Sequence, residues 1–318
     1  MAVSDGVHLL VPFAFCGAPQ ARELLASLPL PNLQRLLRRL GPESTDKGAP
    51  GSLSAPHERI LARAWGLEPA EGLIPFAALQ VHQAGHDPGE DGWAWITPCH
   101  WRVGRDHVDM ANPQDLQLDA EDSQALLAVM QPYFTEDGIT LAYDAPLRWL
   151  ARGGIFRTLP SASLDRMIGR SIDPRMPGGD AGRPVRRLQQ EMQMLLYTLP
   201  LNDARQRRGL LPVNSFWVSG TGALPASGVR ATPEIEVSPY LRDAALVGDW
   251  RGWAAAWQEL DARDGARLLA EVESGRDVRL TLCGEANAQT WSSTAATAWR
   301  RITGWLQRPA PAKLLESL

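Results

Sequence analysis

The sequence predicts an α/β fold in which a mainly parallel sheet is covered by helices. Short apolar runs typical of buried strands alternate with segments whose apolar side chains recur at helical spacing. The alternation stands on both sides of a middle segment with a different pattern, which predicts an inserted subdomain. A length of 318 residues with 44% hydrophobic residues is sufficient for a sizeable core in one large domain or two smaller ones.

The first part of the chain, residues 1–92, is expected to begin the core of this fold. A continuous apolar run at 7–15 predicts a buried strand, and two leucine-rich helical segments follow that are broken at Pro29 and Pro31. Glycine, proline and serine predict a loop at 41–56. A helix is expected next at 57–65.

The middle segment, residues 93–152, is expected to form the small inserted α/β subdomain. Two paired strands are predicted within 93–110, a helix at 119–134 and another strand at 139–145. The remainder, 153–318, should complete the core and add C-terminal helices. We expect there an amphipathic helix after a loop at 173–184, strands at 213–219 and 278–282, and helices near 239–247, 249–260, 262–274 and 294–306.

Charge and cysteine usage exclude several functional classes. Lysine and arginine number 32 against 36 aspartates and glutamates, and without a basic run no nucleic-acid partner is expected. The apolar stretch near the N-terminus is shorter than the roughly 20 residues of a spanning helix, so no membrane association is expected. The three cysteines have no metal-binding spacing, which favours a reduced, cytoplasmic protein without a cofactor.

Residues 201–225 carry the clearest indication of a binding site. The strand at 213–219 runs into Gly220, Thr221 and Gly222, and such a turn presents backbone N–H groups at the carboxyl end of a sheet, where α/β proteins bind ligands. Arg205 could grip a carboxylate or phosphate. The alternative is purely structural, with glycines that form a turn, Asn202 as a helix cap and Arg205 on the surface. The predicted ligand-binding residues are Asn202, Arg205, Asn214, Gly220, Thr221 and Gly222.

The same block resembles a known family. The pattern carried by Asn202, Arg205, Gly209, Pro212, Asn214, Trp217, Gly220, Gly222 and Pro225 is similar to archaeal-type cofactor-independent phosphoglycerate mutases of the alkaline-phosphatase superfamily. The sequence of residues 213–222, VNSFWVSGTG, resembles that of the bacterial RpfE-type regulatory proteins. The resemblance implies an alkaline-phosphatase-like fold.

The departures from that family concern its chemistry. Working members use Asp and His ligands to hold two divalent metal ions that activate a serine. Here the place of the first Asp reads Ala-Phe-Cys-Gly at 14–17, the serine position falls on His57, and the late Asp-His pair corresponds to Leu-Cys-Gly-Glu at 282–285. All six histidines precede residue 108. We therefore expect no metal site, and His57 is the sole catalytic candidate.

Three functional hypotheses follow from this comparison. The leading one is a non-catalytic or catalytically altered phosphoglycerate-mutase-like protein that regulates by binding a small anionic ligand or a protein partner. The second is a metal-dependent phosphotransferase whose atypical residues Cys16, His57, Asp165 and Glu285 converge. The third is a partner-binding scaffold, which requires that a tryptophan stripe on one helix be exposed, although such stripes usually face the core. Its residues would be Trp250, Trp253 and Trp257, with Trp299 and Trp305 nearer the carboxyl end.

Overall fold

The structure, a computed structural model, describes residues 6–68, 70–230, 235–296 and 315. The chain divides into two compact units, one made of residues 1–51, 55–65 and 230–318, the other of residues 52–54 and 66–229. In the first unit the N–H of Arg230 donates a 2.9 Å hydrogen bond to the carbonyl of Trp65. The long segment 66–229 therefore leaves this unit and returns to it at two residues that are neighbours in space.

The first unit is built on a five-stranded mixed sheet with a parallel centre. Strand β1 pairs in parallel with β10 on one side and β9 on the other, while β11 is antiparallel to both β10 and β2. This arrangement confirms the predicted α/β class and the parallel pairing at its centre. The strands are β1 (Val7–Val11), β2 (Gly41–Asp46), β9 (Ile235–Val237), β10 (Val278–Cys283) and β11 (Ala288–Ser292).

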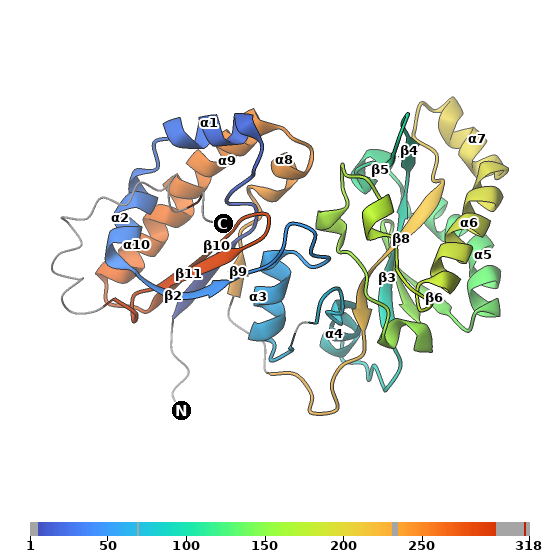
Figure 1. Cartoon of the computed structure of the whole chain (residues 1–318), viewed down its shortest axis with the longest axis horizontal. Helices are drawn as coiled ribbons and strands as arrows, with labels where there is room; N and C mark the ends of the chain where they lie inside the picture. Colours follow the sequence, from blue (N-terminus) through green and yellow to red (C-terminus); the bar gives the residue numbers. More distant parts are fainter. Residues whose placement is uncertain (1–5, 69, 231–234, 297–314, 316–318) are drawn as a thin grey trace. The chain divides into compact units, whose positions relative to one another are not determined.

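Helices cover both faces of this sheet. Successive side chains of a strand point to opposite faces, and the successive residues Leu9, Leu10 and Val11 of β1 are all apolar and buried. Leu9 and Val11 pack in the same apolar cluster as side chains from four helices, whereas Leu10 packs near Ile60 and Leu61 of α3. Figure 1 shows α1, α2, α9 and α10 grouped together over the sheet. The helices are α1 (Pro19–Ser27), α2 (Pro31–Arg39), α3 (Pro56–Ala64), α8 (Arg242–Leu246), α9 (Trp250–Leu260) and α10 (Ala266–Glu273), with a π-helical turn at Asp261–Gly265.

Three predictions for the first unit need correction or lie outside the structure. The loop expected at 41–56 contains β2, an edge strand whose middle residues are exposed and polar, so that it lacks the apolar alternation of a strand. The first strand ends at Val11, four residues earlier than expected. The helix expected at 294–306 falls mostly outside the described residues, and no helix is formed at 294–296.

The second unit contains an antiparallel sheet and a separate hairpin. The sheet order is β6-β7-β3-β8, with β8 at one edge, and β4 pairs with β5 in a two-stranded hairpin. The segment 93–110 thus forms more strands than predicted. The strands are β3 (Trp93–Cys99), β4 (Trp101–Val103), β5 (Val108–Met110), β6 (Thr140–Ala145), β7 (Arg148–Arg152) and β8 (Ser215–Gly222).

Helices α5 and α6 pack on one face of the second sheet and α4 on the other. Ile96 shares a buried cluster with Phe134 of α5 and Leu188 of α6. Trp95, which points to the opposite face, stacks on Phe76 of α4 with ring centroids 6.2 Å apart. The helices are α4 (Phe76–Gln83), α5 (Ala120–Glu136), α6 (Arg183–Tyr197) and α7 (Pro200–Arg207).

The second unit extends well beyond the segment expected as an insertion. Residues 93–152 lie within it, together with 66–92 and 153–229, because β3 pairs with β8 as well as with β7. Whether 93–152 alone is an inserted subdomain stays a prediction. Among the described residues, no helix combines the length and the apolar character needed to cross a membrane.

Candidate functional site

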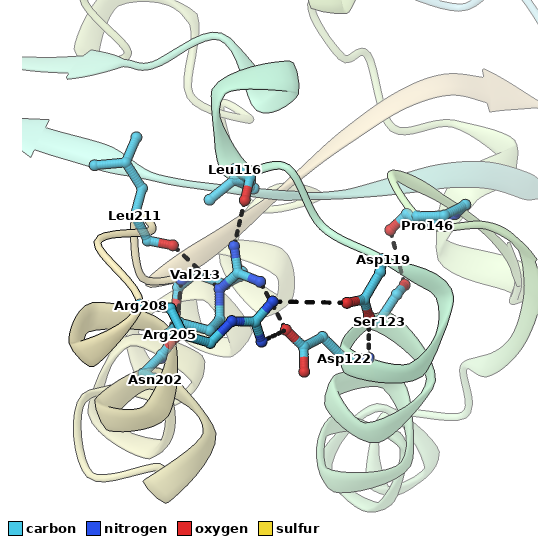
Figure 2. A network of polar contacts seen from close by, with 10 residues as sticks. All are labelled: Leu116, Asp119, Asp122, Ser123, Pro146, Asn202, Arg205, Arg208, Leu211 and Val213. Carbon is cyan, nitrogen blue, oxygen red and sulfur yellow. Dashed lines mark hydrogen bonds and ion pairs between the residues drawn. The ribbon is translucent and has the colours of Figure 1, made fainter.

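Arg205, predicted to grip an anion, is fully buried and bonded within the second unit. Its guanidinium donates to Asp122 Oδ2 at 2.8 Å, to the carbonyl of Leu211 at 3.2 Å and to the carbonyl of Leu116. Figure 2 shows these bonds, which join α7 to α5 through Asp122, to the backbone before α5 at Leu116 and to the backbone after α7 at Leu211. The expected surface position in the alternative interpretation is wrong, because the side chain is inside the protein.

Asn202, one turn before Arg205 on α7, ties the helix to the chain on either side of it. Its Nδ2 donates to the carbonyls of Leu196 at 2.8 Å and Val213 at 2.7 Å, and its Oδ1 accepts from the N–H of Val213 at 2.9 Å. Both amide hydrogens and the carbonyl oxygen are therefore engaged. The side chain holds the segment that leads into β8. Asn202 lies within α7, whose N-cap is Leu199, so the helix cap of the alternative interpretation is wrong.

The side chain of Asn214, just before β8, makes the two hydrogen bonds with β4 that a neighbouring strand would make. Its Oδ1 accepts from the N–H of Trp101 at 2.7 Å, and its Nδ2 donates to the carbonyl of the same residue at 2.9 Å. A side-chain amide has the same donor and acceptor as a peptide group, so it can satisfy a strand edge in this way. Asn214 thus covers one residue of the outer edge of the hairpin.

The Gly220-Thr221-Gly222 segment forms the end of β8, which corrects the predicted turn. Gly220 has φ +62°, and a Cβ there would lie 2.8 Å from the indole of Trp95. Glycine is required on both grounds. Thr221 is fully buried, with its Oγ1 2.7 Å from the carbonyl of Leu159. The strand continues because it pairs with β3 across an irregularity opposite these glycines.

A pocket of about 900 Å³ lies in the second unit between α6, α7 and the β4-β5 hairpin. Asn202 and Asn214 both line it, whereas Arg205, Gly220, Thr221 and Gly222 do not. A ligand-binding role for these six residues stays a prediction. The other lining residues are Trp101, Val103, Val108, Ile172, Asp173, Met176, Arg186, Gln189, Gln190, Gln193, Leu196, Tyr197, Asp203, Gln206 and Pro212.

The glutamines of this pocket were not among the residues predicted from the sequence. Gln189 and Gln193 are one helical turn apart on α6, and Tyr197 follows a further turn along, so the three side chains form one stripe. Gln189 is buried and donates from Nε2 to the carbonyl of Phe216 at 3.1 Å, while its Oε1 accepts no hydrogen bond within the described part of the chain. Polar residues next to the apolar stripe of a predicted amphipathic helix were the available signal.

The carboxyl end of β1, in the first unit, is where the family resemblance places the first metal ligand. Phe13 occupies this turn with φ +56°, a conformation that is uncommon for an aromatic residue. Its carbonyl accepts a 2.9 Å hydrogen bond from Nε1 of Trp253, and its ring lies 5.9 Å from the His57 ring. His57 is thus buried beside an aromatic ring, at the start of α3.

Beyond Phe13 the same turn approaches the end of β10. A Cβ on Gly17 would lie 3.3 Å from Oε2 of Glu285, and Cys16 is buried. Asp165, the fourth residue of the atypical ligand set, belongs to the second unit, so convergence of all four stays a prediction. Within the described residues, no group of three or more histidines, cysteines, aspartates or glutamates is arranged to hold a metal ion.

A buried ion pair joins α3 to the end of β2. Arg59 of α3 donates from Nε to Asp46 Oδ2 at 2.9 Å and from a terminal nitrogen to the carbonyl of Ala286 at 2.8 Å. Arg63 contacts the other oxygen of Asp46 at 2.5 Å. Burial raises the pKa of the neighbouring Cys283 thiol, and the Asp46 carboxylate acts in the same direction. The thiol is therefore neutral and unreactive at neutral pH.

The tryptophan helix is part of the core, as stripes of this kind usually are, so the exposed face that the partner-binding scaffold requires is absent at Trp253 and Trp257. Trp253 and Trp257 of α9 are both fully buried, and their rings meet edge to face with centroids 6.2 Å apart. Trp250 is partly buried against the same apolar cluster. These residues occur at helical spacing because they face the sheet. Trp299 and Trp305 lie outside the described residues.

Comparisons with known proteins give distant structural likenesses. No protein-family model matches the chain, and no curated protein matches it. A cofactor-independent phosphoglycerate mutase from Thermoplasma acidophilum is similar with 13% identity and a TM-score of 0.36, over 90% of this chain and 88% of the other. The PH0037 protein from Pyrococcus horikoshii is similar with 12% identity and a TM-score of 0.44, over 98% of this chain and 97% of the other.

Proposed function

We propose that the chain is a phosphoglycerate-mutase-like regulatory protein of the bacterial RpfE type, which binds a ligand or a protein partner in the cytoplasm without phosphotransfer. The resemblance of residues 201–225 supports the relation to that family. The departures at the expected metal and serine positions support the loss of its reaction. Fold alone does not assign a function, so the proposal depends on the residues at these positions.

The observation that carries the proposal is the packing at the carboxyl end of β1. A two-metal site needs carboxylate and imidazole groups that converge on open coordination positions. At this turn the chain instead has Phe13, whose carbonyl is bonded to Trp253 and whose ring packs near His57. Asp46, at the end of β2, is held by Arg59 and Arg63 of α3. These contacts support a structural role for the residues that replace the family's ligands.

Of the two kinds of ligand, a protein partner has the stronger support. The predicted anion grip of Arg205 is not available, because its guanidinium is bonded to Asp122 and to two carbonyls inside the protein. The pocket that Asn202 and Asn214 line is bordered by the exposed side chains of Val103 and Tyr197. Exposed apolar and aromatic side chains beside a pocket are typical of interaction surfaces.

The proposal is tested by turnover assays of the full chain. Interconversion of 2- and 3-phosphoglycerate and hydrolysis of p-nitrophenyl phosphate would be measured with added Mn²⁺, Zn²⁺ or Mg²⁺, together with the metal content of the purified protein. We expect no turnover above that of a His57→Ala variant and less than one metal ion per chain. Turnover that His57→Ala abolishes, with stoichiometric metal, would establish the metal-dependent phosphotransferase instead.

A further inference from the structure

The outer edge of β4 offers one unpaired backbone position next to the pocket. In an antiparallel pair, the N–H and C=O groups of successive residues point alternately toward and away from the partner strand. Trp101 directs both groups to Asn214, which is away from β5. Val103, two residues further along, therefore directs its own N–H and C=O to the same side.

The contacts at the tip of the hairpin agree with this alternation. The N–H of Gly104 donates to the carbonyl of His107 at 2.8 Å, so Gly104 points inward and Val103 outward. No hydrogen bond to a backbone or side-chain group outside the hairpin engages Val103 within the described residues, and Val103 is 85% exposed. Asn214 therefore pairs with one residue of the edge, and Val103 leaves a donor and an acceptor open.

The pocket beside this edge has groups suited to a peptide. Trp101, Val103 and Val108 give it an apolar wall on the hairpin side, and the stripe of Gln189, Gln193 and Tyr197 lies on α6. Amide side chains both donate and accept, as a peptide backbone requires. Gln193 makes no side-chain hydrogen bond within the described part of the chain.

The charges of the lining favour a basic occupant. Asp173 and Asp203 line the pocket and form no ion pair among the described residues. Arg186, the only arginine among the described residues of the lining, directs its guanidinium to the carbonyls of Pro177 and Gly179. Two carboxylates thus stand against one cation that is already bonded, and a lysine or arginine on the ligand would complement them.

We propose that the β4 edge and its pocket bind an extended, basic peptide segment of a partner protein as an added strand. Main-chain hydrogen bonds to Val103 would fix the direction and register of the segment. The pocket beside the β4 edge would bind those side chains of the segment that point toward it, which are every second one. The inference rests on the partner-binding part of the proposed function and names the chemistry of the partner.

The first experiment identifies ligands for the full-length protein. An array of capped hexapeptides with apolar residues at alternate positions and lysine at two others is compared with a matched array in which glutamate replaces lysine. We expect lysine peptides that bind at least tenfold more tightly than their glutamate counterparts, with an affinity that falls as salt increases. If no lysine peptide binds, or the glutamate peptides bind as well, the proposal is wrong.

The second experiment tests the added strand. Val103→Pro removes the outward N–H, a change that an edge strand tolerates, and Val103→Thr alters the side chain but keeps that N–H as a control. For the best lysine peptide we expect at least tenfold weaker binding to Val103→Pro and less than threefold change for Val103→Thr. N-methylation of the peptide should also weaken binding to the unaltered protein tenfold, which provides a test without any change in folding.

A third comparison tests whether the carboxylates of Asp173 and Asp203 attract the basic peptide. Asp173→Asn and Asp203→Asn should together weaken the lysine peptide at least tenfold, whereas Asp106→Asn in the exposed hairpin loop should leave its affinity unchanged. Peptide binding that resists Val103→Pro and N-methylation would contradict the added strand. If the peptide experiments fail, the result of the turnover assays still stands. If the protein shows turnover, the result of the peptide experiments still stands.

Discussion

The carboxylate of Asp261 accepts a 2.6 Å hydrogen bond from the backbone N–H of Leu33, a residue 228 positions earlier in the chain. The other carboxylate oxygen accepts from the N–H of Asn32 at 3.2 Å. These are open donors of the first turn of α2, whose own N-cap residue, Leu30, supplies no side-chain hydrogen bond. The π-helical turn after α9 thus caps a helix that is remote in sequence.

Asp261→Ala should destabilise the first unit more than the loss of an ordinary cap does. It removes the hydrogen bond from the buried N–H of Leu33 and those from the partly buried N–H and Nδ2 of Asn32, so we expect a loss of about 2–3 kcal/mol in the free energy of unfolding, measured by urea denaturation. Asp249 caps α9 through one hydrogen bond to the N–H of Gly252, and Asp249→Ala should cost about 1 kcal/mol. Equal losses for the two variants would contradict the cross-chain cap.

Arg205→Met should be strongly destabilising because it leaves Asp122 without its main partner. The Arg205 side chain is 1% exposed and that of Asp122 16%, so we expect a loss of about 3 kcal/mol in the free energy of unfolding. Arg208, which also contacts Asp122 but is 54% exposed, provides the control. Arg208→Met should cost less than about 1 kcal/mol by the same urea denaturation. Similar effects of both variants would refute a structural role specific to Arg205.

Gly220→Ala should combine backbone strain with a steric clash. Gly228 has a similar positive φ, +76° against +62°, but a Cβ there meets nothing within 4 Å, whereas at Gly220 it would lie 2.8 Å from Trp95. Gly228→Ala therefore reports the backbone cost alone, about 1 kcal/mol. Thermal and urea unfolding should show a loss for Gly220→Ala that is greater by at least about 1 kcal/mol. A difference near zero would mean that the indole moves freely.

His8 should make the first unit sensitive to mild acid. Its Nε2 lies 2.8 Å from Oγ1 of Thr281, and burial, helped by Arg279 and opposed by Glu43, lowers the pKa of His8 to about 4. Since the unfolded value is about 6.5, the unfolded chain binds the proton first, and stability is lost as the pH falls from about 6.5 to 4. From pH 7 to pH 5 this loss amounts to about 2 kcal/mol or less, because His8 is only partly buried.

The variant His8→Gln isolates this contribution from general acid effects. Urea denaturation at pH 7 and pH 5 should show a smaller pH-dependent loss for His8→Gln than for the unaltered protein, by about 1–2 kcal/mol. The exposed His86 provides the control, because His86→Gln should preserve the full loss. An unchanged pH dependence in His8→Gln would show that His8 titrates at its ordinary pKa in the folded protein.

The sequence allowed the fold class to be predicted because the buried strands β1 and β10 are apolar and the amphipathic helices have clear periodicity. It did not allow β2 to be predicted, since the exposed positions Pro42 to Thr45 have no pattern that distinguishes an edge strand from a loop. The strand forms because β11 supplies its hydrogen bonds. Long-range pairing of this kind is decided by tertiary structure rather than by local propensity.

The candidate site shows the same limit more sharply. Asn202, Arg205 and Asn214 were identified from their residue types, but those types serve equally for ligands and for internal hydrogen bonds. The acceptor that engages Arg205 is Asp122, 83 positions away, and no local pattern connects them. The pocket was not foreseen either, because it forms where α6 meets a hairpin that is distant in sequence.

The hydrogen bond between Trp65 and Arg230 has a consequence for the modular history of the chain. Because the exit and the return of residues 66–229 are joined by one 2.9 Å contact, this segment can be regarded as a cassette with both ends at a single insertion point. Replacement of the cassette would leave the sequences of β1, β10 and their covering helices unaltered. The peptide-binding edge proposed here belongs to that cassette, so its residues can be changed without any substitution in the sheet of the first unit.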